Sequence, residues 1–276
     1  MKFRIVAAAA MTVAVATGLL GATTIANAKP APKAYTCTGG SRPGFDPTAW
    51  TFVRIPSGTY SSLTVNGVCQ VGPGTVIHVE GNVNVTDGSV FDAQTFASKV
   101  TVDGNVTAAW GSLLGLGCLP NPPDHTTGHP CIDPGNGNPS VLSSSITVNG
   151  NVTATDADTV LLNGITVHGN VVLSGGGEEY IPWPIKWNTI GGDLIVRHVA
   201  ANWVGVLLNH VGGSASLTNI TITDPGDPTP TAFVVSNRIE ENLICKDIGP
   251  NLIAALPGEN NVVDGQKFGQ CDVTSP

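Results

Sequence analysis

The stretch Val79-Glu80-Gly81-Asn82-Val83-Asn84-Val85 contains a seven-residue motif that returns along the chain. Apolar residues hold its first, fifth and seventh positions, and Gly followed by Asn or Asp holds the third and fourth. Alternation at the fifth and seventh positions points two apolar side chains to one face of a strand. Because Gly and Asn tolerate positive φ, the motif predicts a strand, a sharp bend and a second strand. Clear copies begin at Val102, Val148 and Val167, and looser copies begin at Ile190, Val211 and Ile239.

The spacing of these copies predicts a stacked solenoid. Most copies lie about 20 to 25 residues apart, which is a repeat length typical of such folds. The 46-residue interval between Gly104 and Gly150 equals two such periods. Stacking would place the seventh-position side chains in one apolar column, which we expect to contain Val71, Val85, Ala108, Ala154, Leu173, Val196, Leu217 and Cys245. The Asn residues of the motif would form a second, polar column.

We therefore predict an all-β fold, a right-handed parallel β-helix of about eight or nine coils with disulfide-capped ends. An antiparallel sandwich is the main alternative, because a Gly-Asn pair can also turn a hairpin. A left-handed solenoid is another, although its six-residue spacing at Val79, Val85 and Phe91 does not persist.

Residues 1–28 have the pattern of a secretory signal peptide. Lys2 and Arg4 precede an apolar run, and Ala26-Asn27-Ala28 is a small-residue cleavage site. We expect a secreted, extracellular protein that is not bound to a membrane after cleavage. The remainder divides into an N-terminal cap over residues 29–54 and a single β-helix domain over 55–276. The domain has an inserted loop at 115–140.

The charge balance limits the possible partners. Loss of Lys2 and Arg4 with the leader would change the formal net charge from −8 to about −10. An acidic surface disfavours nucleic acid, anionic membranes and acidic polysaccharides. No phosphate loop or other cofactor motif occurs, so we expect no cofactor. The oligomeric state stays open.

All six cysteines follow the predicted leader, and an even number in an exported chain indicates disulfides. Of the 15 formal connectivities, we predict a sequential set that fastens both ends of the stack and the inserted loop. The pairs are Cys37–Cys69, Cys118–Cys131 and Cys245–Cys271.

The strongest candidate for ligand binding is a departure from the repeat near residue 180. Aromatic rings beside carboxylates suit sugars, whose C–H faces pack on the rings while their hydroxyls bond to the acids. The candidate ligand-binding residues are Tyr180, Trp183, Trp187, Glu178 and Glu179. The alternative is that the Trp residues fold back and bury their apolar area against one face of the solenoid.

Weaker candidates are interpreted as ordinary turns or loops. Asp156 and Asp158 would project about 7 Å apart from one face of a strand, a spacing that glycosidase carboxylates use. They are the catalytic candidates if the protein is an enzyme. Asp224 and Asp227 flank a Pro-Gly turn and could hold calcium. His125 and His129 are four residues apart but lie in a Pro-rich loop, and we predict no metal site.

The Gly-Asn-Val coils and the ending Asn261 to Cys271 resemble secreted bacterial β-solenoid proteins of uncharacterised function. The resemblance covers roughly residues 55–271 and implies no activity. The coils are also faintly similar to those of bactofilins, which polymerise end to end. A comparison with polygalacturonases fails, because each supposed match lacks its catalytic member. These matches are Asn188-Thr189-Ile190, Val167-His168-Gly169 and Arg238-Ile239-Glu240.

The function hypothesis is a non-enzymatic extracellular protein, either structural or binding a glycan or cell-wall component. The alternative is a polysaccharide hydrolase or lyase on the same scaffold.

Overall fold

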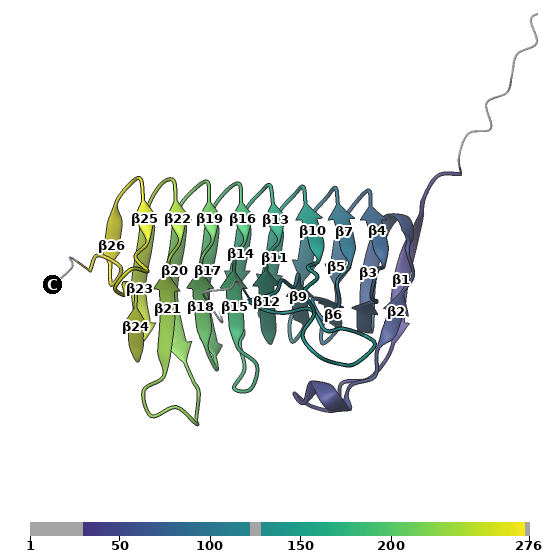
Figure 1. The fold of residues 1–276 in the computed structure, drawn as a ribbon, viewed down its shortest axis with the longest axis horizontal. Coiled ribbons are helices and arrows are strands. Elements are labelled where there is room, and N and C mark those ends of the chain that lie inside the picture. Colours follow the sequence, from purple (N-terminus) through teal and green to yellow (C-terminus); the bar gives the residue numbers. More distant parts are fainter. Residues whose placement is uncertain (1–29, 122–127, 274–276) are drawn as a thin grey trace, which may run out of the picture. The chain divides into compact units, whose positions relative to one another are not determined.

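The structure, a computed structural model, describes residues 30–121 and 128–273. The chain separates into two units, Met1–Ala31 and Pro32–Pro276. The predicted leader, residues 1–28, lies outside the described residues. The unit Pro32–Pro276 is a right-handed parallel β-helix, which confirms the predicted fold class (Figure 1). Within the described ranges its only helix is η1 (Pro47–Ala49), a single 3-10 turn.

Three parallel faces form the β-helix. Face 1 consists of β4 (Val76–Val79), β7 (Lys99–Val102), β10 (Ser145–Val148), β13 (Thr166–Val167), β16 (Thr189–Ile190), β19 (His210–Val211), β22 (Arg238–Ile239) and β25 (Val262–Val263). Face 2 consists of β5 (Val83–Val85), β8 (Val106–Ala108), β11 (Val152–Thr155), β14 (Val171–Ser174), β17 (Leu194–Ala201), β20 (Ala215–Ile222), β23 (Leu243–Gly249) and β26 (Lys267–Gly269). Face 3 consists of β6 (Val90–Ala93), β9 (Leu113–Leu116), β12 (Thr159–Asn163), β15 (Trp183–Lys186), β18 (Val204–Leu207), β21 (Thr231–Val235) and β24 (Asn251–Ile253).

The first coil is one long strand, β3 (Gly58–Val71), which pairs with β4, β5 and β6 in turn. Seven coils of three strands follow, and β25 with β26 makes the ninth coil of the described chain. Two cap strands, β1 (Lys33–Gly39) and β2 (Val53–Ile55), pair with β3 on its other side. This agrees with the predicted eight or nine coils.

The repeated motif forms the corner between faces 1 and 2. The Gly104 N–H donates to the Gly81 carbonyl at 3.0 Å, and the Gly150 N–H donates to the Gly104 carbonyl at 3.0 Å. Beside this backbone column, each Asn Oδ1 accepts the backbone N–H of its counterpart one coil later. The pairs Asn82–Asn105, Asn105–Asn151 and Asn151–Asn170 each measure 2.8 Å. The predicted polar column of Asn residues is therefore present. Its hydrogen bonds join the side chain of one Asn to the backbone N–H of the next.

The reason for the glycine differs from the sequence interpretation. Gly81, Gly104, Gly150 and Gly169 are absent from the residues with positive φ. A Cβ on Gly104 would instead lie 2.3 Å from Asn82 Oδ1 and 2.7 Å from the Gly81 carbonyl oxygen. Gly is needed because the Asn of the coil before occupies the space of a side chain.

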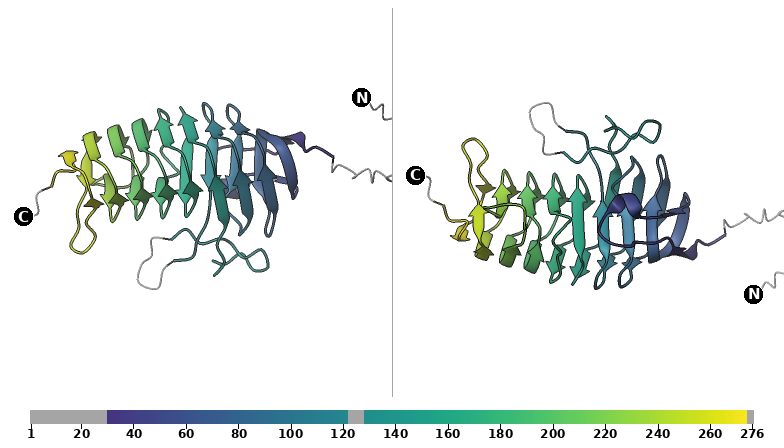
Figure 2. Two further views of the ribbon diagram at one scale, coloured as in Figure 1. Left: turned by 90° about the horizontal axis from the view of Figure 1, so that it is seen from above. Right: turned by 90° about the horizontal axis from the view of Figure 1, so that it is seen from below.

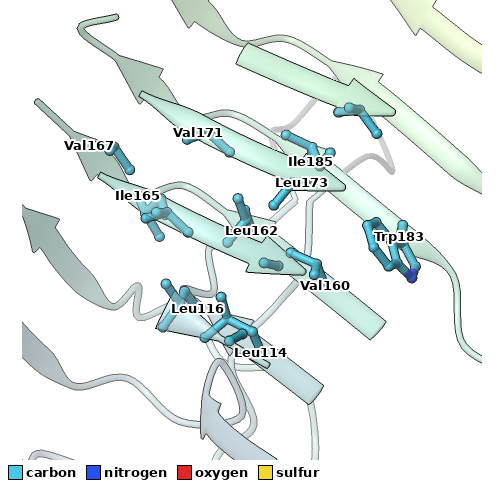
Figure 3. Packing of buried hydrophobic residues seen from close by; sticks show 14 of the residues in the cluster. Leu114, Leu116, Val160, Leu162, Ile165, Val167, Val171, Leu173, Trp183 and Ile185 are labelled. Atoms are coloured by element: carbon cyan, nitrogen blue, oxygen red, sulfur yellow. The ribbon is translucent and has the colours of Figure 1, made fainter. Parts of the chain in front are cut away.

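The interior is a set of aliphatic columns, part of which Figure 3 shows. The predicted seventh-position column is confirmed from Val85 to Cys245 by the register between coils. The predicted first member of the column, Val71, is wrong, because Val65 pairs with Val85. The first coil lacks the Gly-Asn pair, so its corner gives no marker for the alignment.

A second, buried Asn column lies in the later coils, at the turn from face 3 to face 1. Each side-chain amide donates to the Oδ1 of the Asn one coil later, at 2.9 to 3.0 Å. The backbone carbonyls of Leu162, Ile185 and Val206 also accept from this column. The side-chain amides of this column are thus paired with one another, which limits the free-energy cost of burying them. The members are Asn188, Asn209, Asn237 and Asn261.

The inserted loop leaves the stack after β9 and returns at β10, so it spans residues 117–144, and not the predicted 115–140. No coil is missing there, because β10 pairs directly with β7. Figure 2 shows the loop projecting from the side of the stack. The three predicted disulfides are present, and they fasten the cap, the inserted loop and the last coil. They are Cys37–Cys69, Cys118–Cys131 and Cys245–Cys271.

Candidate functional site

The N-terminal cap folds across the outside of face 3, where Arg42 fastens it. The Arg42 guanidinium forms an ion pair with Asp158 and donates to the Gly111 carbonyl at 3.4 Å. It also lies 4.9 Å from the ring centre of Phe45 and 5.7 Å from that of Trp50. Cation–π contacts of this length are attractive, so one cation joins the cap aromatics to the coils.

Phe45 of the cap stacks on Tyr180. Their ring centres are 5.3 Å apart with an interplanar angle of 19°. Tyr180 is 67% exposed, so much of its ring is open to solvent. A shallow hollow is bounded by Phe45, Asp46 and Tyr180. Hydrogen bonds from Thr48 hold Asp46 at the start of η1 and lower the pKa of its carboxyl.

Glu178 holds Tyr180 in place. Its carboxylate accepts the backbone N–H of Tyr180 at 2.6 Å and that of Ile181. Burial raises the pKa of Glu178 even though these hydrogen bonds oppose the shift. Glu179 is exposed, and its carbonyl accepts from Asn202 at 2.9 Å. Glu178 therefore supports the loop, whereas the Glu179 side chain faces solvent.

The two predicted Trp residues do not join this surface. Trp183 is fully buried among the core side chains of β12 and β15 (Figure 3), and its indole N–H donates to the Asp158 carbonyl at 3.0 Å. Trp187 adopts a left-handed backbone conformation with φ 59°, and its indole nitrogen is buried without a partner among the described residues. Of the five predicted contact residues, the structure leaves Tyr180 and Glu179 exposed.

A pocket of about 280 Å³ is bounded by residues of the same two segments. Cap residues Trp50 and Phe52 form one wall, and Ile181 forms another. The apolar floor comes from Leu113 and Leu161 on face 3. We call the Phe45–Tyr180 surface and this pocket together the cap site.

The polar end of the pocket is built around Asp92. Its carboxylate accepts the backbone N–H groups of Gln94 and Thr95, both at 3.0 Å, and the Thr95 hydroxyl at 2.6 Å. The Gln70 amide is a further donor. Gln94 lies against Gly115, and its side-chain oxygen is buried without a partner in the described ranges.

Sequence reasoning missed Phe45, Asp92 and Gln94. One signal was available, because Asp92 interrupts an otherwise apolar strand and Gly115 stands beside it in register on β9. The contact between Phe45 and Tyr180 had no such signal, since 135 residues separate them.

The remaining candidate residues lie outside the cap site, and their side chains bind neighbouring groups of the protein. Asp156 and Asp158 occupy the bend between β11 and β12, so the expected projection from one strand is wrong. Asp156 has φ 51°, and Arg42 neutralises Asp158. Asp224 and Asp227 each accept a backbone N–H of their own turn at 2.8 Å.

His125 lies outside the described residues. His129 belongs to the inserted loop and is partly buried, and burial and the Lys186 charge lower its pKa. In residues 30–121 and 128–273, no three His, Cys, Asp or Glu side chains are grouped as a metal site would need. Over the same residues, no helix has the length and apolar character to cross a membrane.

Comparisons with protein-family models, with curated proteins and with solved structures gave no significant match to this chain.

Proposed function

We propose that this protein is a secreted, non-enzymatic β-helix that binds an extracellular glycan or cell-wall component at the cap site. The observation that carries the proposal is the Phe45–Tyr180 stack, in which Tyr180 is exposed. The exposed Asp46 bounds the same hollow, and the exposed Glu179 precedes Tyr180 in the chain. The C–H face of a sugar ring would pack on Tyr180, and its hydroxyls would donate to the acids. The resemblance to secreted bacterial solenoids supports secretion, and it implies no activity.

Rigidity supports the proposal further. Glu178 fixes the Tyr180 loop, and the cap is held by Arg42 and by the Cys37–Cys69 disulfide. A site on ordered segments loses little conformational entropy on binding. The carboxylates and the acidic chain favour a neutral or cationic glycan over an acidic one.

Secretion is part of the proposal. Three disulfides indicate an oxidising environment. The leader-like residues 1–28 supply the route.

The alternative hydrolase or lyase has less support. Hydrolysis by paired carboxylates needs both acids to face one glycosidic bond. The Asp158 carboxylate faces Arg42 instead.

The test is to incubate mature protein with insoluble polysaccharides and peptidoglycan, and to measure retained protein and released sugar ends in the same samples. We expect retention on at least one neutral polymer, abolished by a Phe45→Ala/Tyr180→Ala double variant. Release of sugar ends by the wild type, or equal retention of the double variant, would contradict the proposal.

A further inference from the structure

A second pocket lies on face 3 near the C-terminal end of the stack, separate from the cap site. Its floor is formed by outward side chains of β18 and β21, among them Leu207, Phe233 and Val235. The Trp203 indole folds flat over Gly205, where a Cβ would lie 1.9 Å from the ring. The Trp203 and Phe233 ring centres are 6.1 Å apart with an interplanar angle of 41°. Gly205 thus makes room for an aromatic wall.

The loop between β24 and β25 closes the other side with Leu256 and Glu259. The Glu259 N–H donates to the Leu256 carbonyl at 2.9 Å, and the Glu259 carbonyl accepts from the Ser236 N–H at 3.0 Å. The buried Asn261 amide donates to the Ala254 carbonyl at 2.9 Å. The loop is therefore anchored to the stack, and the pocket of about 260 Å³ is preformed.

Glu259 is the one charged residue among those that line this pocket. Among the ion pairs of the described residues, none involves its carboxylate. An anion beside aromatic rings selects a cation, because the ring faces also attract positive charge. A carboxylate ligand would be repelled by Glu259 and by the acidic chain.

We infer that this pocket binds a small arylalkylamine, with its apolar body between Trp203 and Phe233 and its ammonium group against Glu259. The inference is independent of glycan binding at the cap site. A preformed apolar pocket with one convergent polar group is the usual form of a small-molecule site.

The test compares three ligands of similar size and different charge: phenethylamine, 2-phenylethanol and 3-phenylpropionate. Each is titrated into the mature protein near neutral pH, and the indole N–H resonance of Trp203 is followed by NMR. We expect saturable binding, with phenethylamine at least tenfold tighter than 3-phenylpropionate. Glu259→Gln should reduce the affinity for the amine to that for the alcohol, leaving binding of the alcohol unchanged.

Glu80→Gln is the matched control, since Glu80 is an exposed acid on the second coil, and it should change nothing. Leu256→Ala removes one wall and should weaken the amine and the alcohol equally. The inference is overturned if no ligand saturates, if the carboxylate binds as tightly as the amine, or if Glu259→Gln keeps the preference for the amine.

Discussion

Asn105 Oδ1 accepts the backbone N–H of Asn151 at 2.8 Å across 46 residues of sequence. The same oxygen lies 2.5 Å from the place where a Cβ on Gly150 would stand. The Asn of one coil and the Gly of the next are therefore one structural unit. The eighth coil supports this relationship: Glu241 replaces Gly where the coil before carries Ser214 in place of Asn.

Gly150→Ala should lower the free energy of unfolding by about 3 kcal/mol, because the methyl group would overlap Asn105 Oδ1 and the Gly104 carbonyl oxygen. Adding Asn105→Ser should recover part of this loss. The measurement is denaturant unfolding of both variants. Gly44→Ala is the control, since a Cβ there meets nothing within 4 Å. A Gly150→Ala variant as stable as the wild type would refute the pairing.

The sequence predicted this corner because the motif repeats every coil, and stacking places identical residues in register. The sequence did not predict why glycine is required there, since a Gly-Asn pair is equally typical of a bend with positive φ. The cap site was less predictable still. Tyr180 and Trp183 were predicted together, because their segment departs from the repeat and combines aromatic residues with carboxylates. Only Tyr180 is exposed, whereas Trp183 faces the core. Alternation could have separated the two, but the Pro182 and Pro184 around Trp183 obscure it.

Asn209→Ala should lower the free energy of unfolding by about 3 kcal/mol or more, since unpaired buried polar groups cost about 1–3 kcal/mol each. Asn209 donates to Ile185 and Asn237 and accepts twice from Asn188. Thermal and denaturant unfolding measure the loss. Asn251→Ala, which removes one exposed hydrogen bond, should change the value by less than about 0.5 kcal/mol. Equal losses in the two variants would show that a hydrogen bond in the buried Asn column stabilises the fold no more than an exposed one.

Acidification should destabilise the protein through His129. Burial lowers the pKa of His129 below 6.5, and the Lys186 charge adds to the effect while Asp92 opposes it. His129 therefore binds a proton more readily in the unfolded chain than in the folded one. The contribution of neutral His129 to the free energy of unfolding is complete above pH 6.5, and it is lost as the pH falls toward the pKa of His129 in the folded protein. Unfolding free energies of wild type and His129→Gln from pH 8 to 5 should diverge in that window. Parallel curves would exclude His129, and exposed His168→Gln is the control.

Removal of the Cys118–Cys131 disulfide should loosen the inserted loop and leave the coils intact, because β10 pairs with β7 without it. In a Cys118→Ser/Cys131→Ser variant, amide exchange should accelerate over residues 128–140. The amides of Ser145–Val148 should keep their protection. Loss of protection in β10 would show that the loop helps to set the register.

We propose above that Tyr180 and Phe45 form a glycan-contact surface. The most direct measurement is the dissociation constant of Tyr180→Ala and Tyr180→Phe on a polysaccharide that retains the wild type. Loss of an aromatic contact worth about 1.4 kcal/mol predicts roughly tenfold weaker binding for Tyr180→Ala. Tyr180→Phe should stay near the wild type, as should Phe268→Ala, which removes a partly exposed ring on the last coil. Unchanged binding by Tyr180→Ala, or an equal loss in Phe268→Ala, would contradict the claim.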